Sequence, residues 1–498
     1  MISSIFLTFS DGAKFALVAK NLFLGNGFAT DFSFWGGNLF ATGGISRLVP
    51  YSILPFFKLF GVGDFAVIAS SFFYYLLLVG IIFLLGRKLF GSLVGALSAL
   101  VVLANLNFIN YATSGASEPL FTFLMVLSAY FLILRKRWAT ATSFVVMAAM
   151  YFSRPQAVIF IAGLILFWLI LRFGLKKASI YFLGLGALGY LIDKFIIYPL
   201  SFKYPLTPVF ARGIQGILTY SSNTAVSDAL RGAVSSTLTT FDVFKKVFYN
   251  LYNFYKLLPQ IISPYLAAFF VLGLFIKEKT KEASALKAAS VFMVVVTFLV
   301  TALTIPFFRY LHPVVPLVYL FATATLVWIV GKMVKKRLVA VVSTLLIVFL
   351  VVGQTLGVIF LDSRFKAART NKGKPPVYVV LSRVLKENTP PDSIIVTNLD
   401  TWGSWYGERK TIWYPLKPEQ LRGLENKVDA IYLTSYLIDD ENYYMGPEWR
   451  QIFESPKSRE DEFIAKNYRF VGEFKVSAED TYEKQEARAI LLIKKPGE

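Results

Sequence analysis

The chain has 498 residues, of which 56% are hydrophobic and 16% aromatic, and its mean hydropathy is positive. This composition excludes an ordinary soluble globular protein and favours an integral membrane protein. Residues 362–498 contain 22 of the 51 Lys and Arg and 22 of the 31 Asp and Glu, so the whole net charge of +20 lies in the first 361 positions. A basic excess confined to the apolar part indicates loops that flank membrane spans and excludes nucleic acid as the partner.

The chain contains no Cys and one His. Disulfides, zinc sites and Cys or His nucleophiles are therefore excluded. Any catalysis must depend on carboxylates, cations or hydroxyl groups. No cofactor follows from these residues, and a divalent cation remains an open alternative.

The N-terminal residues do not form a complete span. Residues 1–10 are apolar but too short to cross a bilayer, and they lack the basic start of a signal peptide. We therefore expect that a first helix ending before Asp11 is missing or truncated. Residues 11–60 mix apolar and polar positions with Gly-Gly breaks. This pattern predicts amphipathic helices in the outer membrane interface, one of them over 12–24.

Ten apolar stretches follow, separated by polar or basic breaks. A span needs about 20 apolar residues to cross a hydrocarbon core of about 30 Å, and the third and fourth stretches are short for a full crossing. The predicted spans are 65–86, 93–109, 120–134, 139–152, 156–173, 178–199, 259–276, 288–305, 314–331 and 338–360.

Alternate connections between these spans are rich in Lys and Arg, which places them on the cytoplasmic side. The five basic connections are 87–88, 135–137, 176–177, 277–287 and 332–337. The other connections then face outward, together with the loops 11–64 and 200–258 and the C-terminal residues. The sequence thus predicts a multi-pass protein of the cell membrane, in contact with the lipid bilayer.

The composition changes at the linker 372–376, and short alternating segments follow. We predict strands at 393–398, 410–414, 429–434 and 490–494, with a helix at 418–426. The predicted fold class is a polytopic α-helical membrane protein with about 10–11 transmembrane helices and a small C-terminal α/β domain. The predicted domains are a transmembrane catalytic domain, 1–361, and an extracytoplasmic α/β domain, 362–498.

Nine carboxylates precede residue 362, and six of them face outward in this topology. A carboxylate in hydrocarbon costs about 2.5–3.5 kcal/mol, so one at the membrane rim generally has a partner or a task. Glu118 directly precedes a span, and its structural alternative is a first-turn acid in a helix capped by Ser117. Asp11 has the same alternative at the helix 12–24. Asp193 beside Lys194 is interpreted as a structural pair inside the sixth span.

Two outward turns at the membrane rim carry the cations Arg154 and Arg309. One interpretation is that these side chains extend to lipid headgroups. The other is that they converge with Lys14 on the phosphate of an anionic lipid, for which Arg offers a two-pronged donor. His312 lies in the second turn, and a metal role is not expected for it.

The run Gly184 to Gly189 matches the dinucleotide-binding pattern G-x-G-x-x-G in form. It lies inside an apolar span with no strand before it. We therefore predict that these glycines allow close packing of helices.

Four parts of the chain resemble motifs of one family. Residues 11–15 (DGAKF), followed by 21–28 (NLFLGNGF), look like an outer loop with an acid-acid-x-basic-aromatic motif, and 117–121 (SEPLF) resembles a second acidic site. Residues 309–316 (RYLHPVVP) and 405–410 (WYGERK) resemble an Arg-Tyr-x-x-Pro-x-x-Pro element and a Trp-Tyr-Gly-x-Arg stretch. The family is that of the lipid-phosphosugar-dependent glycosyltransferases of the GT-C fold, which includes protein O-mannosyltransferases and lipid A aminoarabinose transferases.

The resemblance implies an inverting hexosyl or pentosyl transfer from a polyprenyl-phosphate sugar to a hydroxyl of a lipid, glycan or protein acceptor, on the outer face of the membrane. It implies that Asp11 is the general base and that Glu118 orients the acceptor or acts as a second acid. The residues that it assigns to the donor phosphate are Lys14, Arg47, Arg154, Arg309 and Tyr310, and those of the outer-domain motif are Trp405, Tyr406 and Arg409.

The chain departs from the family pattern in its first outer loop. Gly12 replaces the usual second acid, and the basic-Pro-Pro-aromatic motif is reduced to 46–51 (SRLVPY), where Arg47 takes the place of the lost basic residue.

Three other functions were considered from the same residues. An inner-face nucleotide-sugar enzyme is disfavoured, because the inner connections contain only Glu278 and Glu282 and no D-x-D motif occurs. A transporter or flippase of lipid-linked glycans would place charges at the membrane midplane, whereas here only 193–194 lie within a span. A polymerase or ligase of lipid-linked glycans would share the outer-face chemistry and differ in its acceptor.

Overall fold

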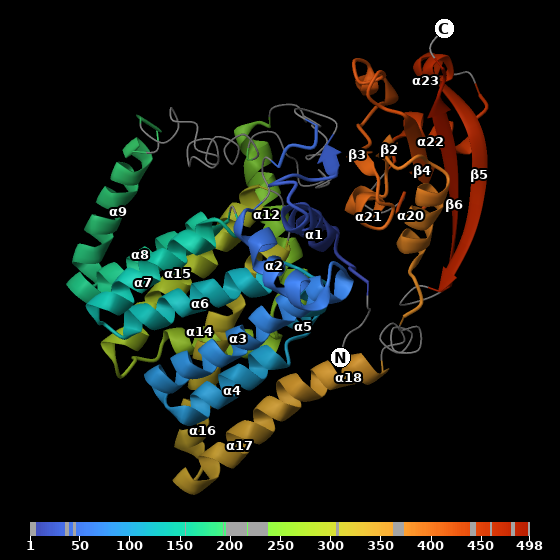
Figure 1. The fold of residues 1–498 in the computed structure, drawn as a ribbon. Helices are drawn as coiled ribbons and strands as arrows, with labels where there is room; N and C mark the ends of the chain where they lie inside the picture. The colour runs from blue at the N-terminus through green and yellow to red at the C-terminus, as the bar shows by residue number, and fades with distance from the viewer. Residues whose placement is uncertain are drawn as a thin grey trace.

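The computed structural model comprises a bundle of helices and, beside it, a mixed sheet covered by short helices (Figure 1). Asp193, most of the loop 200–258 and the start of the linker 372–376 lie outside the described residues. The described ranges are 6–34, 39–42, 46–154, 156–192, 194–195, 217, 238–304, 308–361, 373–438, 445–458, 461–479 and 484–496.

The first part of the chain supplies the helices that lead into the bundle and its first half. These helices are α1 (Ser10–Phe23), α2 (Leu48–Phe60), α3 (Asp64–Phe90), α4 (Ser92–Leu103), α5 (Leu106–Thr113), α6 (Glu118–Ile133), α7 (Arg137–Tyr151), α8 (Ala157–Phe173) and α9 (Leu175–Ile192). The second half contains α12 (Thr240–Lys256), α13 (Leu258–Ile261), α14 (Pro264–Leu274), α15 (Lys281–Leu303), η2 (Phe308–Val314), α16 (Val315–Met333), η3 (Lys336–Leu338), α17 (Val339–Ile347), η4 (Val348–Gly353) and α18 (Gln354–Leu361).

Within the described residues, each of the ten predicted spans coincides with one helix or with consecutive helical segments. Five described helices are long and apolar enough to cross a membrane, and the pair α4 and α5 would make a sixth. That pair was predicted as one span, 93–109, but it bends by 59° at the break. The Asn105 side chain accepts a hydrogen bond from the Phe108 N–H, so it starts a new helix where the span was expected to continue.

Small residues allow close helix contacts in the bundle, but not where the sequence predicted them. A Cβ on Gly86 would lie 2.8 Å from the Gly95 Cα, so α3 and α4 touch through their backbones. At Gly184, Gly186 and Gly189 no described atom lies within 4 Å of such a Cβ. The prediction of close packing at this run was therefore wrong for the described residues, since α9 presents these positions outward.

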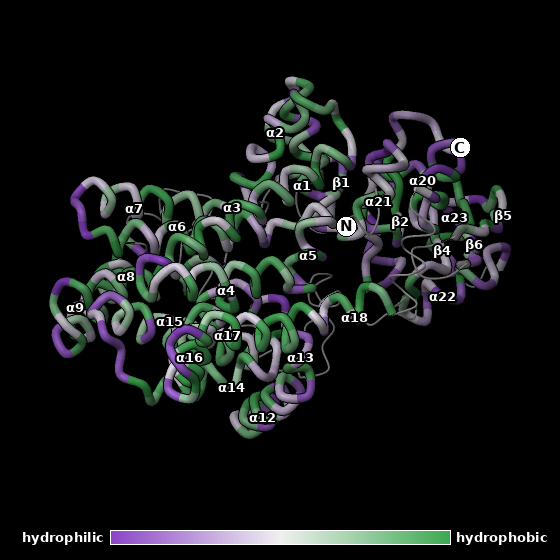
Figure 2. Tube along the Cα trace, turned by 90° about the horizontal axis from the view of Figure 1, so that it is seen from below, coloured by the Kyte–Doolittle hydropathy of each residue, from purple (hydrophilic) through white to green (hydrophobic). Residues whose placement is uncertain are grey.

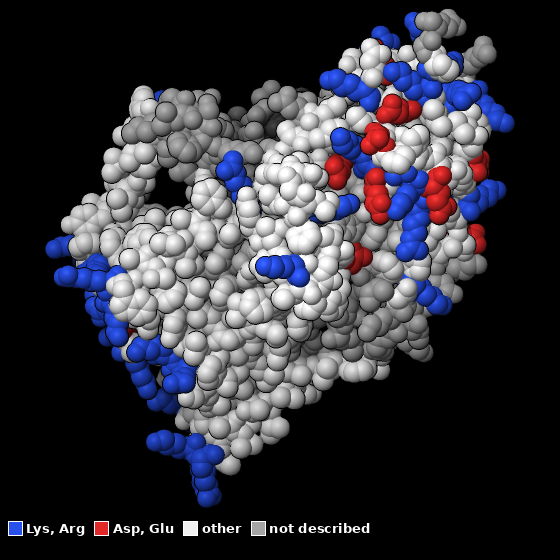
Figure 3. All heavy atoms as spheres, in the orientation of Figure 1, with Lys and Arg blue, Asp and Glu red and all other residues white. Residues whose placement is uncertain are grey.

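The hydropathy of the bundle is that of a membrane protein. Apolar residues follow its helices over their lengths, and polar residues gather at the turns (Figure 2). Lys and Arg line the edge of the bundle far from the sheet, whereas basic and acidic residues alternate over the sheet and its helices (Figure 3). This distribution is consistent with a basic membrane face on one side only.

The sheet has six strands in the order β1-β3-β2-β4-β6-β5. The first four strands in this order are parallel, and β6 and β5 complete the sheet in antiparallel register, with a bulge between Phe470 and Gly472. The strands are β1 (Phe32–Phe34), β2 (Ile394–Thr397), β3 (Lys410–Trp413), β4 (Ala430–Thr434), β5 (Tyr468–Glu479) and β6 (Lys484–Lys494). The four predicted strands are present, while β1 and β5 were missed.

Short helices cover the sheet: α20 (Val377–Glu387), α21 (Asp400–Trp405), α22 (Pro447–Glu454) and α23 (Glu462–Asn467). Alternating side chains of β4 point to opposite faces, with Ile431 and Leu433 in one apolar core and Tyr432 in the other. The helix predicted at 418–426 is only a single turn, η5 (Pro418–Leu421). Arg422 already leaves the helical conformation with a ψ of 131°, and Gly423 follows with a positive φ of 89°, so the helix does not continue.

The N-terminal loop joins the bundle to the sheet. Strand β1 pairs with β3, and Leu17 of α1 packs in a core of the sheet together with Ile412 and Trp413. Helix α1 also packs against α21 and α2. The first turn of α1 therefore lies between the two parts of the molecule, and this turn contains Asp11.

Candidate functional site

Asp11 lies in the first turn of α1, where a carboxylate interacts favourably with the positive end of the helix. The next residue, Gly12, contacts the loop before α6. A Cβ on Gly12 would lie 2.8 Å from the Ser114 carbonyl oxygen and 3.2 Å from that of Gly115. An acid at position 12 would not fit, so the departure from the family pattern has a steric reason.

Glu118 is the first residue of α6 and its side chain is 1% exposed. The Nη1 atom of Arg154, from the turn between α7 and α8, lies 2.5 Å from Glu118 Oε1. The same Nη1 donates to the Ser117 hydroxyl at 3.4 Å, and Ser117 makes no side-chain cap of α6. The capping alternative for Ser117 was therefore wrong, because this hydroxyl is turned toward Arg154.

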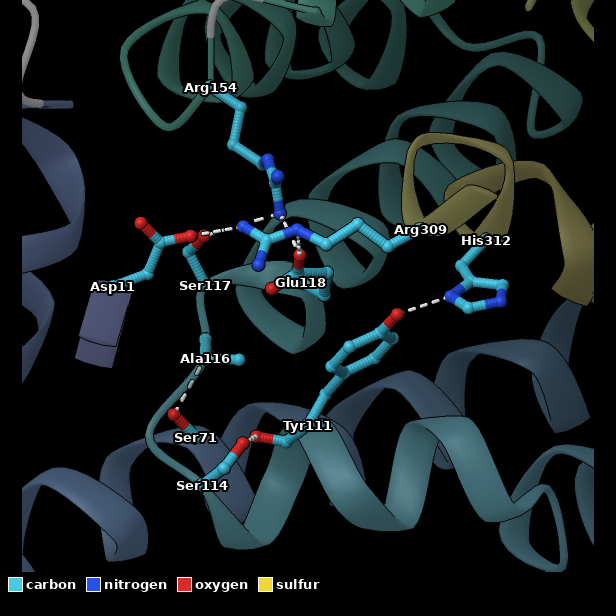
Figure 4. A network of polar contacts seen from close by, with 10 residues as sticks. All are labelled: Asp11, Ser71, Tyr111, Ser114, Ala116, Ser117, Glu118, Arg154, Arg309 and His312. Carbon is cyan, nitrogen blue, oxygen red and sulfur yellow. Dashed lines mark hydrogen bonds and ion pairs between the residues drawn. The ribbon is translucent and has the colours of Figure 1, made fainter. Parts of the chain in front are cut away.

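Arg309 of η2 connects the two carboxylates. Its Nη2 donates to Asp11 Oδ2, and its Nε lies 3.2 Å from Glu118 Oε1 (Figure 4). We call Asp11, Glu118, Arg154 and Arg309 the rim cluster. Both arginines are turned toward carboxylates inside the protein, so the alternative that they extend to lipid headgroups does not describe this structure.

The charges around Asp11 keep it ionised. Its side chain is 36% exposed. Burial raises the pKa of the Asp11 carboxyl, but the Arg309 guanidinium and the Lys14 ammonium outweigh burial and lower the pKa to about 2. Lys14 lies one turn along α1, with its Nζ 5.3 Å from the centre of the Phe34 ring. Asp11 is therefore a carboxylate at neutral pH.

Tyr111 and His312 form a neutral pair beside the cluster. The Tyr111 hydroxyl and His312 Nδ1 form a hydrogen bond, and His312 Nε2 lies 3.3 Å from the Gln260 carbonyl oxygen (Figure 4). A carbonyl only accepts, so Nε2 carries the proton and Nδ1 accepts from Tyr111. Both His312 nitrogens have protein partners, and the pair connects η2 to α5.

One predicted donor-binding residue lies apart from this network. Arg47 is exposed just before α2, and no ion pair joins it to the rim cluster among the described residues. Tyr310 follows Arg309 in η2 and is half-buried.

The outer-domain motif contacts the bundle through Asp64, the first residue of α3. Trp405 Nε1 donates to Asp64 Oδ1 at 2.6 Å, and the Tyr406 hydroxyl donates to Asp64 Oδ2 at 2.9 Å. Arg409 has a different position: it is buried and donates to the carbonyls of Lys386 and Thr389 at the end of α20. Arg409 thus stabilises a helix C-terminus and does not contact the rim cluster.

Asp64 and Asp400 are neighbours of the site that sequence reasoning did not select. Asp400 begins α21 with a positive φ of 53°, accepts from the Thr401 N–H at 2.7 Å and is hydrogen-bonded to the Ser10 side chain. Burial raises the pKa of Asp400 above its ordinary value. The signal available for Asp64 was its position before a span, which it shares with Glu118.

The described residues offer no group of three or more His, Asp or Glu side chains for a metal ion. Asp11 and Glu118 are both paired with guanidinium groups, which is a poor setting for a cation.

Comparisons with known proteins agree with this architecture. Residues 47–194 match the family model of the dolichyl-phosphate-mannose-protein mannosyltransferases, which is less than a third of the chain. No curated protein sequence matches the chain significantly. The structure is similar to that of ArnT from Cupriavidus metallidurans in the apo state, with a TM-score of 0.52 and 11% identity over 98% of this chain and 94% of that one.

A second similar structure is the archaeal oligosaccharyltransferase AglB from Archaeoglobus fulgidus, in complex with an inhibitory peptide and a dolichol-phosphate. Its TM-score is 0.52 at 12% identity, over 96% of this chain and 70% of that one. The chain thus has the GT-C fold of membrane glycosyltransferases, as the sequence predicted, and it is a multi-pass membrane protein with a small C-terminal sheet region.

Proposed function

We propose that the protein transfers a hexosyl or pentosyl group from a polyprenyl-phosphate donor to an acceptor hydroxyl, with inversion, on the outer face of the membrane. The observation that carries this proposal is the rim cluster, in which an ionised, partly exposed carboxylate lies beside two guanidinium groups. The matched family model, named for dolichyl-phosphate-mannose, and the dolichol-phosphate in the AglB complex support a lipid-phosphate donor.

The cluster offers what a single displacement requires. Asp11 accepts the proton of the acceptor hydroxyl as its oxygen bonds to the sugar C1, and the C1–O bond to the phosphate breaks. The electron pair leaves with the polyprenyl phosphate, which is already anionic and needs cations more than an acid. Arg309, Arg154 and Lys14 supply those cations, and attack from the side opposite the phosphate inverts C1.

Arg309 has a central part in this scheme because it holds both carboxylates before substrate arrives. A donor phosphate competes with Asp11 for the Arg309 guanidinium, because a phosphate can accept two parallel hydrogen bonds from that group. When Arg309 turns to the phosphate, the Asp11 carboxylate loses its closest cation and becomes a stronger base. Donor binding would therefore activate Asp11.

The test is transfer of radiolabelled sugar from polyprenyl-phosphate donors to a membrane extract, with Asp11→Asn as the variant. We expect turnover to fall by about 10²–10⁴-fold, the usual contribution of a general base. The matched control is Asp242→Asn, an outward acid that caps α12 through Thr239. Wild-type turnover in Asp11→Asn would remove the base assignment. Label that crosses sealed vesicles without transfer would favour the transporter.

We further propose that residues 1–361 form a transmembrane catalytic domain and that 362–498 form an extracytoplasmic domain, completed by β1. The chain contains no Cys, so a thiol reagent labels the protein only at a cysteine that is introduced by substitution. We expect a membrane-impermeant maleimide to label Asn426→Cys on intact cells and to leave Lys279→Cys, in a basic connection, unlabelled. The reverse pattern would overturn the orientation.

A further inference from the structure

The segment that leads into α1 has no regular secondary structure of its own. Residues 6–9 precede the first helical residue, Ser10, and Leu7 is fully buried. Buried backbone N–H and C=O groups need partners, and an irregular segment cannot supply them internally. The partners come from the C-terminal part of the chain.

Both backbone groups of Leu7 are bound by side chains near α21. The Leu7 N–H donates to the Tyr406 hydroxyl at 2.9 Å, which in turn donates to Asp64. The Leu7 carbonyl accepts from Trp402 Nε1 at 3.1 Å and from the Tyr378 hydroxyl at 3.2 Å. The rings of Tyr378 and Trp402 are stacked, with their centres 4.7 Å apart.

Helix α21 also binds the residue before Asp11. The Thr401 hydroxyl donates to the Ser10 carbonyl at 2.7 Å, and Asp400 is hydrogen-bonded to the Ser10 side chain. Three backbone groups and one side chain of residues 7–10 are thus bound by α21, by Tyr406 directly after it and by Tyr378 of α20. None of these contacts involves a charged partner that a substrate phosphate would attract.

The opposite side of the segment packs on the loop before α6. Gly115 has a φ of 76°, and a Cβ there would lie 2.9 Å from the Leu7 side chain. Together with the contact of Gly12 with Ser114, this leaves the segment no room to move toward α6. The first turn of α1 is therefore enclosed between α21 and the loop that leads to Glu118.

We propose that Tyr378, Thr401, Trp402 and Tyr406 are positioning residues for catalysis, which hold residues 7–10 and thereby fix Asp11 against Arg309 and the acceptor. The inference depends on the proposed function, because it acts through Asp11. It gives the C-terminal part of the chain a role in the transfer step itself. A general base displaced by about 1 Å loses on the order of 10²-fold in rate, so small shifts of this segment matter.

The test uses the full-length protein in lipid nanodiscs with Tyr378→Phe and Thr401→Val combined. Both substitutions keep the side-chain shape and remove one hydrogen bond each. We expect kcat to fall by about 10- to 100-fold with an unchanged donor KM. The matched control is Tyr432→Phe, whose hydroxyl donates to the Leu381 carbonyl at 3.0 Å inside the sheet core.

Two further readouts separate positioning from a general loss of structure. Amide exchange of residues 7–12 is expected to be about tenfold faster in the double variant, since a lost hydrogen bond contributes roughly that factor. The acidic limb of the kcat/KM profile, which reports the protein before donor binds, is expected to move to higher pH as Asp11 withdraws from Arg309. The charged groups that face Asp11 are Lys14, Glu118, Arg154, Arg309 and Asp400.

The outcomes are distinct. Slower turnover, faster exchange and a shifted limb in the double variant, with none of these in Tyr432→Phe, support the inference. Wild-type turnover in the double variant would overturn it and leave the proposed function standing if Asp11→Asn is inactive. An equal loss in Tyr432→Phe would also overturn it. Full turnover by Asp11→Asn would reject the base and the positioning role together.

Discussion

Carboxylates have different partners in the rim cluster and beside α21. Asp11 and Glu118 are paired with arginines, and the Arg309 and Lys14 charges lower the pKa of Asp11 to about 2 despite burial. Asp64 and Asp400 accept hydrogen bonds from uncharged groups, and burial raises the pKa of Asp400.

Carboxylates paired with arginines and carboxylates bound by uncharged donors are suited to different tasks. An arginine that neutralises a carboxylate can exchange it for another anion, so the rim cluster is suited to a phosphate that arrives and leaves. An indole or phenol that donates to a carboxylate or a carbonyl fixes geometry and attracts no anion. In our proposal, the rim cluster therefore provides the chemistry of transfer, and the contacts around α21 position its Asp11.

The largest expected effect tests the pairing inside the rim cluster. Arg154→Met removes the closest partner of Glu118 and leaves a buried carboxylate with a weaker one, so we expect a loss of about 3 kcal/mol in unfolding free energy. Thermal unfolding in detergent measures it. The control is Arg135→Met in the exposed pair with Glu282, where a change within about 1 kcal/mol is expected. Equal losses of unfolding free energy in Arg154→Met and Arg135→Met would show that the buried pair of Arg154 with Glu118 contributes no more to stability than an exposed pair.

The close contact of Gly12 with the loop before α6 predicts the next effect. Gly12→Ala places a Cβ within 2.8 Å of a backbone oxygen, so α1 must shift away from the loop before α6. We expect turnover to fall by about 10²-fold. Gly80→Ala, in open space on α3, is the matched substitution and should leave turnover unchanged. A fully active Gly12→Ala would mean that the spacing of the carboxylates is not critical.

Arg309 offers a smaller and more specific effect. Arg309→Lys keeps the charge and loses the two-pronged donor, so we expect donor affinity to weaken about tenfold, the loss of one charge-assisted hydrogen bond. Titration with an unreactive polyprenyl phosphate measures it. An affinity equal to wild type would exclude direct contact between this guanidinium and the phosphate.

The smallest effect is on pH dependence. The folded pKa of Asp11 is about 2, below its ordinary value of 3.8, so its pairing with Arg309 is complete at neutral pH and is lost as pH falls from about 4 to about 2. The kcat/KM value, which reports the protein before donor binds, should therefore not decline between pH 7 and pH 5 because of Asp11. Arg309→Gln should raise the Asp11 pKa and move the acidic limb upward. An acidic limb at the wild-type pH would show that Arg309 does not set the pKa of the group responsible for this limb.

Much of the bundle and part of the site could be predicted from sequence. Long apolar stretches mark spans because a bilayer core has a fixed thickness. The rarity of outward carboxylates made Asp11 and Glu118 candidates, and the family resemblance assigned their roles. The bend at Asn105 was missed because one capping side chain interrupts a stretch that remains apolar. Strand β1 was missed because three residues carry no local signal, and its pairing with β3 depends on the fold.

The contacts around α21 could not be predicted from local patterns. The family resemblance selected Trp405 and Tyr406, but their partner Asp64 lies about 340 positions away in the chain. Hydrogen bonds to the Leu7 and Ser10 backbone involve no side chain of the segment, so no residue type there indicates them. Arg409 was assigned with the same motif, although its partners are carbonyls at the end of α20.

The most direct test of the division of tasks compares turnover and donor binding in Asp11→Asn. We predict turnover lower by about 10²–10⁴-fold, with donor affinity equal to wild type or tighter, because the substitution frees Arg309 for the phosphate. Turnover near the wild-type rate, or a loss of donor binding that accounts for the lost turnover, would contradict the assignment of Asp11 as the base and Arg309 as the phosphate ligand.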